Sequence, residues 1–168
     1  RPGVWLESLS GGGVPPPPVG IVNDKGRRRA RGRMDYVLRV RVTMDTQPVA
    51  LALLEAKRSG VPPGHGLSQA KDYLRACKRL NVRFVFSSNG HQYVEYDSFS
   101  GLTSGPIPME RFPSPEALRA RYEEGMGFTL DAQEARPLLQ PYRGGEGVRR
   151  YYQDAAIRAV IEQIAQQE

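Results

Sequence analysis

The chain has 168 residues, 39% of them hydrophobic and 25% charged, which is the composition of one globular domain and excludes a wholly disordered protein. Its longest apolar run, residues 49–54, is far shorter than the roughly 20 residues of a membrane span, and no signal-peptide pattern opens the sequence. The 24 Lys and Arg outnumber the 18 Asp and Glu, and the resulting charge of +6 favours a polyanionic partner such as nucleic acid, although many basic proteins have no such partner.

The single cysteine, Cys77, cannot form an internal disulfide. It lies among apolar residues of a predicted helix, where a small core residue is the simplest interpretation. A lone thiol fits a reducing compartment, so we expect a soluble, cytoplasmic protein with no membrane contact.

Residues 1–33 are expected to form an irregular N-terminal segment. From residue 10 onward this segment has no hydrophobic period and is dense in Gly, Pro and Arg. It ends in the basic run RRRARGR, in which Arg31 and Arg33 are candidate phosphate contacts. A solvated charged segment is an equally good interpretation of the same run.

Two strands joined by a hairpin loop are predicted next. The first strand alternates between arginines and the apolar residues Tyr36, Leu38, Val40 and Val42. Residues 44–48, with the sequence MDTQP, have the composition of a short loop, and residues 49–57 form the second strand.

The register of this hairpin decides which side chains lie together. If Thr43 faces Val49, then Asp35 faces Lys57. Glu55 then faces residue 37 and points to the same side as both charged residues, because opposed residues share a face of the sheet. The other face receives the apolar residues of the first strand together with Ala50, Ala52 and Leu54, and we expect it to be core.

A helix is predicted over residues 67–80, where apolar residues recur at spacings of three and four. Gln69 and Tyr73 are four residues apart on one face, close to Lys71 and Arg75. Either Tyr73 packs at the edge of the core beside a solvated Gln69, or the pair holds the lysine of a site or a DNA phosphate. Lys71 and Arg75 are candidate phosphate contacts, or they belong to a solvated basic face.

Two further strands, over residues 82–90 and 91–97, meet at an Asn-Gly turn. A short helix is predicted over residues 114–125, with Pro near its start and Gly at its end, and residues 148–168 carry apolar residues at helical spacing. This order of elements predicts an α/β fold in which helices flank a central mixed β-sheet.

Asp35, Glu55 and Lys57 form a candidate catalytic centre. Two carboxylates at one strand end are suitable ligands for Mg²⁺ or Mn²⁺, and such an ion activates water and polarises a phosphodiester. The Lys57 ammonium can steer the water or stabilise developing negative charge. A chain of this length contains about one Asp/Glu-x-Lys triplet by chance, and a surface ion pair contributes less than about 1 kcal/mol, so the support comes from the combination of residues.

Four stretches occur in an order that resembles a known family: MDYVL at residues 34–38, PVALALLEAKRSG at 48–60, GLSQAKDYL at 66–74 and VRFVFSSNG at 82–90. They resemble the N-terminal nuclease domain of the R (motor) subunit of type I restriction endonucleases, a branch of the PD-(D/E)xK nuclease superfamily. The usual Pro of the first motif is Met34 here, while Asp35 is kept.

The resemblance implies a PD-(D/E)xK nuclease-like fold and a metal site. Asp35 and Glu55 would bind the divalent ion, with the backbone carbonyl of Ala56 as a further ligand. Lys57 would be the catalytic lysine of a Mg²⁺-dependent endonuclease.

Other motifs of the family fall on residues outside this triplet. Gln69 and Tyr73 match its Q-x-x-x-Y motif, which supports the site or the DNA backbone. The family often adds an acid from an earlier helix, for which Glu7 is the candidate counterpart.

The end of the chain, VRRYYQDAAIRAV, resembles the start of the superfamily 2 motor that follows the nuclease, where Gln153 would approach the adenine of ATP. No GxxxxGK[ST] occurs, so we expect an N-terminal fragment of a longer protein, with ATP needed only by the missing motor. The expected organisation is an irregular segment at 1–33, an endonuclease domain at 34–147 and the start of a motor domain at 148–168.

The resulting expectation is a metal-dependent endonuclease that cuts double-stranded DNA without reading bases itself. The resemblance implies methyltransferase and specificity subunits as its partners in a restriction complex. Two alternatives stay open: a catalytically silent DNA-binding or docking module of the same fold, and a nuclease of a repair or resolvase system.

Overall fold

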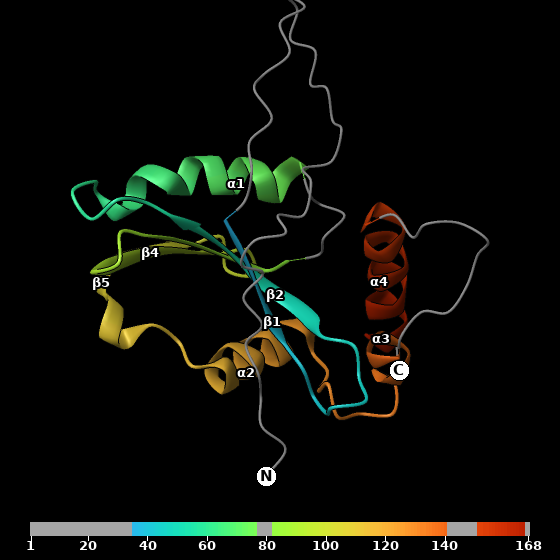
Figure 1. Cartoon of the computed structure of the whole chain (residues 1–168). Helices are drawn as coiled ribbons and strands as arrows, with labels where there is room; N and C mark the ends of the chain where they lie inside the picture. The colour runs from blue at the N-terminus through green and yellow to red at the C-terminus, as the bar shows by residue number, and fades with distance from the viewer. Residues whose placement is uncertain (1–34, 77–81, 141–150, 167–168) are drawn as a thin grey trace, which may run out of the picture.

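The computed structural model describes residues 35–76, 82–140 and 151–166 (Figure 1). Its elements are, in chain order, β1 (Tyr36–Val40), β2 (Val49–Ala56), η1 (Pro63–Gly66), α1 (Leu67–Ala76), β3 (Phe84–Ser88), β4 (Gln92–Asp97), β5 (Thr103–Pro108), η3 (Met109–Arg111), α2 (Pro115–Met126), α3 (Arg136–Leu139) and α4 (Tyr151–Ala165). No helix within these ranges has the length and apolar character that crossing a bilayer requires. Several residues singled out in the sequence lie outside the described ranges: Glu7, Arg31, Arg33 and Cys77.

The five strands form one sheet in the order β1-β2-β3-β4-β5. β2 and β3 are parallel and the other neighbours are antiparallel, so the sheet is mixed. The parallel pair requires a crossover, and α1 provides it. Helix α1 covers one face of the sheet while α2 lies against the other, as Figure 1 shows. The predicted α/β fold with a mixed sheet flanked by helices is confirmed.

The apolar residues of the two faces form separate clusters. On the α1 side, Leu67 and Ala70 pack against Val85 and Val94. On the other side, the largest cluster joins the sheet to α2, α3 and α4 and includes Phe84, Phe86, Leu118, Tyr122, Leu138 and Ala165. Both faces are therefore core, which is why the central strand β3 is buried at all five positions.

The hairpin register differs from the expected one by two residues up to Leu38 and by three residues beyond it. Tyr36 pairs with Leu54 and Val37 with Leu53, so the expected pairing of Val37 with Glu55 was wrong. From Tyr36 to Leu38 the shift of two residues leaves the side chains on their predicted faces, because side chains alternate with a period of two. The predicted placement of the charged residues on one face therefore survives the error.

A β-bulge in β2 accounts for a second difference. The pairing skips Leu51 between Ala52 and Ala50, and Leu51 and Ala52 consequently both contribute to the larger cluster. Ala50 packs instead against the smaller cluster around Leu53, on the opposite side from the one expected.

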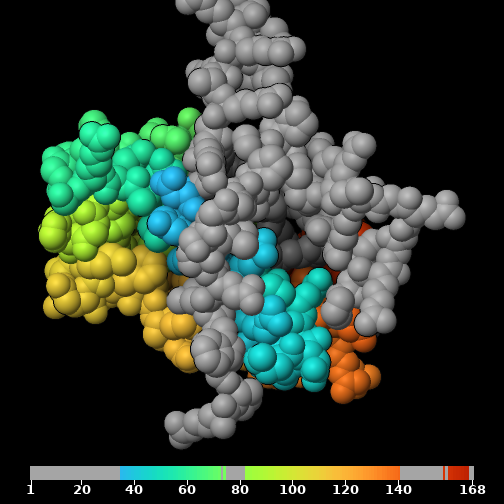
Figure 2. All heavy atoms as spheres, viewed as in Figure 1, coloured from blue at the N-terminus to red at the C-terminus, as the bar shows by residue number. Residues whose placement is uncertain are grey.

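Strand β5 was not predicted from the sequence. It contains Gly105 and two prolines, and five of its six residues are exposed. Proline lacks the amide that an interior strand needs, so such a segment is tolerated only at a sheet edge. In Figure 2 the yellow region, which includes β5 and η3, adjoins the yellow-green region that precedes it in the chain.

Helix α2 begins as predicted but ends later. Ser114 accepts a hydrogen bond from the backbone amide of Ala117, and Pro115 occupies the first turn. The helix continues through Gly125, the expected end, and stops at Gly127, whose φ of 78° is in the left-handed region. Gly125 is needed inside the helix because a Cβ there would lie 2.5 Å from the Phe99 ring.

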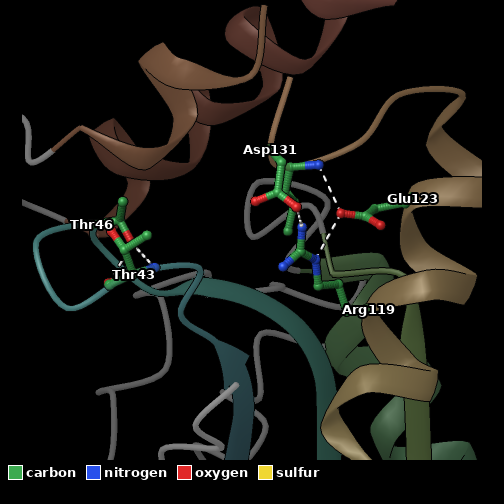
Figure 3. Close-up of polar contacts among 6 residues, drawn as sticks. Thr43, Thr46, Arg119, Glu123 and Asp131 are labelled. Carbon is green, nitrogen blue, oxygen red and sulfur yellow. Dashed lines mark hydrogen bonds and ion pairs between the residues drawn. The ribbon is translucent and has the colours of Figure 1, made fainter. Parts of the chain in front are cut away.

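Side-chain contacts hold the segments beyond the strand and helix ends (Figure 3). The hydroxyl of Thr46 accepts from the amide of Thr43 at 3.0 Å and donates to its carbonyl at 2.8 Å, which closes the β1–β2 loop. After α2, the Arg119 guanidinium contacts Glu123 at 2.8 Å and Asp131 at 2.5 Å. These contacts hold the β1–β2 loop and the segment that follows α2 in place.

Helix α4 is joined to the rest of the fold through a buried carboxylate. Glu162 is 1% exposed, accepts a hydrogen bond from the hydroxyl of Tyr122 in α2, and lies 3.7 Å from the Arg83 guanidinium. The Gln166 side chain donates to the carbonyl of Met126 at 3.0 Å. The helix therefore shares the core of the sheet, and the domain boundary expected at residue 148 stays a prediction.

Candidate active site

Glu55 lies near the end of β2, where an apolar strand turns charged. The preceding residues are buried on both faces of the sheet, and this places the Glu55 carboxylate in the interior with 4% of the residue exposed. Its Oε2 atom is buried and has no hydrogen-bond partner among the described residues. Buried carboxylate oxygens are normally paired, so this atom is available for a ligand.

Asp35 is brought to the same strand end by the hairpin. It immediately precedes β1, and its Oδ2 atom accepts a hydrogen bond from the backbone amide of Ala56 at 2.8 Å. The residue between Glu55 and Lys57 thus holds the Asp35 carboxylate, and the negative charge of Asp35 lies close enough to Glu55 to contribute to the raised pKa of that carboxyl.

Lys57 points back over the end of its own strand. Its Nζ donates to Oε1 of Glu55 at 2.7 Å and to Oε1 of Gln69 at 3.5 Å. The backbone amide of Lys57 donates to the carbonyl of Ser88 at 2.7 Å, which extends the pairing of β2 with β3 by one residue. The ammonium is thereby fixed between a buried carboxylate and the first turn of α1.

Burial raises the pKa of the Glu55 carboxyl above its ordinary value of 4.5. The hydrogen bond from Lys57 opposes this shift, while the negative charge of Asp35 adds to it. Burial has removed water from this carboxylate, so a cation bound beside it would stabilise its charged form.

The wall of the site is formed by Gly66, at the end of η1, and Ser87 in β3. A Cβ on Gly66 would lie 2.5 Å from Ser87 Oγ, 2.7 Å from Lys57 Cε and 2.8 Å from Glu55 Cγ. Ser87 pairs with Glu55 in the parallel register. Neither residue was identified from the sequence as part of the site, although a buried serine directly after the apolar start of β3 was a signal.

Comparison with known proteins gives one informative result. No protein-family model matches the chain, and no curated protein matches it. A similar solved structure is a fragment assigned as an HsdR subunit of a type I restriction enzyme from Vibrio vulnificus YJ016. The similarity covers 99% of this chain at 30% identity, with a TM-score of 0.61.

The chain is similar to a region of an HsdR subunit. It spans 26% of the length of that chain, so the similarity concerns one region of a larger polypeptide. This result supports the expected relationship to the R subunit of type I restriction enzymes.

The donor set fits a hard divalent cation. No group of three or more His, Cys, Asp and Glu side chains suited to a metal is found in the described part of the chain. Two carboxylates with water and a backbone oxygen are nevertheless a usual arrangement for Mg²⁺, which keeps several of its waters. With Glu55 Oε1 taken by Lys57, the unpartnered Oε2 is the atom that would face such an ion.

The other predicted site residues divide into two groups. Gln69 contacts the site through Lys57, while its role in the Q-x-x-x-Y motif stays a prediction. Lys71 turns away to the sheet edge, where Nζ donates to the Thr103 hydroxyl at 2.8 Å and lies 4.1 Å from the centre of the Tyr96 ring. The side chains of Tyr73, Arg75 and Gln153 lie outside the described part of the structure.

Proposed function

We propose that this chain is the metal-dependent endonuclease region of a type I restriction enzyme R subunit, and that it hydrolyses phosphodiester bonds of double-stranded DNA. The observation that carries the proposal is the meeting of Asp35, Glu55 and Lys57 at one end of β2. They are two hard-oxygen ligands and one ammonium: Lys57 donates a hydrogen bond to Glu55, and the Ala56 amide between them donates one to Asp35.

Asp35 and Glu55 would hold Mg²⁺ or Mn²⁺ together with the backbone carbonyl of Ala56. When bound, such an ion supplies an activated water and polarises the phosphodiester. The hydrogen bond from the Ala56 amide orients Asp35, and burial between β3 and η1 orients Glu55. The protein thus fixes both carboxylates before any ligand arrives.

Lys57 would act on the charge that develops during cleavage. Its ammonium is held by Glu55 and Gln69 at the margin of the site, with 23% of the side chain exposed. A fixed ammonium there can stabilise the negative charge that grows on the phosphate oxygens, and can donate a hydrogen bond to the attacking water. Gln69 limits the positions that this flexible side chain can take.

Partners follow from the proposed place in a restriction complex. Methyltransferase and specificity subunits would supply base recognition, and a motor powered by ATP would deliver the DNA. The backbone contacts of this region would then be independent of sequence.

The deciding experiment uses the assembled complex with Lys57→Ala. DNA cutting should fall at least about 100-fold while ATP hydrolysis and translocation stay unchanged, because the ammonium acts only on the chemical step. Arg111→Ala, which removes an exposed positive charge at η3, is the charge-matched control and should cut normally. Normal cutting by Lys57→Ala would refute the proposal, and cutting that prefers branched over linear DNA would indicate a resolvase instead.

A further inference from the structure

Two unpartnered polar atoms lie on neighbouring strands at the candidate site. Ser87 is fully buried in β3 and pairs in register with Glu55 of β2, so the two side chains point to the same side of the sheet. Neither Ser87 Oγ nor Glu55 Oε2 has a hydrogen-bond partner among the described residues. A hydroxyl can donate and a carboxylate oxygen can accept, so the two atoms are chemically complementary.

The space around these atoms is limited by Gly66. An ideal Cβ on this glycine would lie less than 3 Å from Ser87, Lys57 and Glu55 at once. The backbone of η1 therefore rests directly on the three side chains. Any larger residue at position 66 would have to displace the two charged groups on which the proposed chemistry depends.

A purely structural serine would be expected to use its hydroxyl. Ser88, the next residue, does so: its Oγ donates to the carbonyl of Gln92 at 2.9 Å and accepts from the amide of Gly90 at 3.0 Å. The Ser87 hydroxyl has no such bond although the residue is fully buried. Burying an unpaired hydroxyl costs folding free energy unless a further group forms a hydrogen bond with it. The three atoms nearest to the Cβ position of Gly66 are Ser87 Oγ, Lys57 Cε and Glu55 Cγ, so the hydroxyl lies beside the charged side chains of the candidate site.

We propose that Ser87 and Gly66 are positioning residues of the metal site: the Ser87 hydroxyl orients Oε2 of Glu55 toward the ion, directly or through a bound water, and Gly66 leaves the space that Glu55 and Lys57 occupy. The inference rests on the proposed function. It adds two residues from β3 and η1 to a site otherwise drawn from β1, β2 and α1.

The first test measures Mn²⁺ binding to the 168-residue chain by electron paramagnetic resonance. Ser87→Ala should weaken binding by about 10-fold or more, the size of effect seen when a group that orients a metal ligand is removed. In EDTA the same variant should melt at the same temperature as the parent or higher, because the hydroxyl it removes has no partner. A lower melting temperature in EDTA with unchanged Mn²⁺ affinity would show a structural serine and overturn the proposal.

Ser98→Ala is the matched control. Ser98 also has a buried hydroxyl without a partner among the described residues, but it follows β4 at the opposite end of the β3–β4 pair. Its substitution should leave Mn²⁺ affinity unchanged. Equal losses of affinity in Ser87→Ala and Ser98→Ala would contradict a specific role for Ser87.

The second test measures cutting by the assembled complex as a function of Mg²⁺ concentration. Ser87→Ala should move the midpoint to a higher concentration and recover most of its cutting at saturation, whereas Gly66→Ala should stay slow at saturating Mg²⁺ because Lys57 is displaced. Cutting by Gly66→Ala at the parental rate would overturn its part of the proposal.

Variants of the carboxylates distinguish a failure of the proposed metal-dependent function from a failure of the positioning role of Ser87. If Asp35→Asn and Glu55→Gln bind Mn²⁺ as the parent does, the proposed function itself fails. If both lose Mn²⁺ while Ser87→Ala keeps it, the metal site stands and only the positioning role is wrong.

Discussion

The backbone amide of Ala56 donates a hydrogen bond to the Asp35 carboxylate across 2.8 Å. Two residues that are 21 positions apart in the chain are thereby joined at the point where β2 turns from apolar to charged. The contact uses the amide of the residue between Glu55 and Lys57, so the position of Asp35 is tied to the backbone of the triplet itself.

Asp35→Asn tests this link, because an amide oxygen can still accept the Ala56 hydrogen bond but carries no charge. We expect the melting temperature to change little and DNA cutting by the assembled complex to fall at least about 100-fold, since a metal ligand is lost. Asp45→Asn, in the exposed loop at the other end of the hairpin, is the matched control and should cut normally. Full activity of Asp35→Asn would remove Asp35 from the site.

Glu55→Gln should stabilise the metal-free protein at neutral pH. Because burial raises the pKa of Glu55 in the folded state, its contribution to stability is complete below the unfolded value of 4.5 and is lost as the pH rises through the folded value. Melting in EDTA across pH 4 to 8 should therefore show the melting temperature of the variant rising relative to that of the parent as the pH increases, with Glu110→Gln, at an exposed position, as the control. A variant that is less stable than the parent at pH 7 would contradict this expectation.

Tyr122→Phe should destabilise the fold more than Tyr93→Phe. The Tyr122 hydroxyl donates to Glu162, which is 1% exposed, so its removal takes a hydrogen bond from a buried side chain at a cost of about 1–3 kcal/mol. The Tyr93 hydroxyl donates to the carbonyl of Arg111 at 3.0 Å, and loss of that neutral bond should cost about 0.5–1.5 kcal/mol. Urea unfolding measures both, and an equal or reversed order would show that the buried contact is unimportant.

Gly125→Ala should destabilise the protein although alanine favours helix by about 1 kcal/mol. A Cβ at this position would lie 2.5 Å from the Phe99 ring, and such overpacking costs about 1–3 kcal/mol. Gly60→Ala is the control, since nothing lies within 4 Å of its Cβ position. A stabilised Gly125→Ala variant would mean that Phe99 moves aside freely.

The hydrophobic pattern predicted the charged triplet better than it predicted the strand register. The alternation of apolar residues determines which face Asp35, Glu55 and Lys57 share, and an error of two residues in pairing leaves that face unchanged. The bulge at Leu51 could not be foreseen, because both faces of β2 are buried and its sequence shows no alternation that would reveal an extra residue.

Contacts between distant segments could not be predicted from the sequence for a different reason. Ser87 meets Glu55 only through the parallel register of β2 and β3, and Gly66 meets both only because η1 crosses that end of the sheet. The bond between Tyr122 and Glu162 joins two helices 40 positions apart. None of these pairings leaves a local periodicity that could have indicated it.

The parallel pairing of β2 with β3 also sets the order in which the site can be completed during synthesis. Glu55 and Lys57 leave the ribosome before Gly66, and all three precede Ser87, so the carboxylate stays hydrated until β3 has docked beside β2. Closing this pair requires the whole of α1 to cross the sheet first, which makes it a non-local and slow contact. A nascent chain that has not reached residue 88 therefore holds the acids and the lysine but no enclosed site, because β3 is not yet complete.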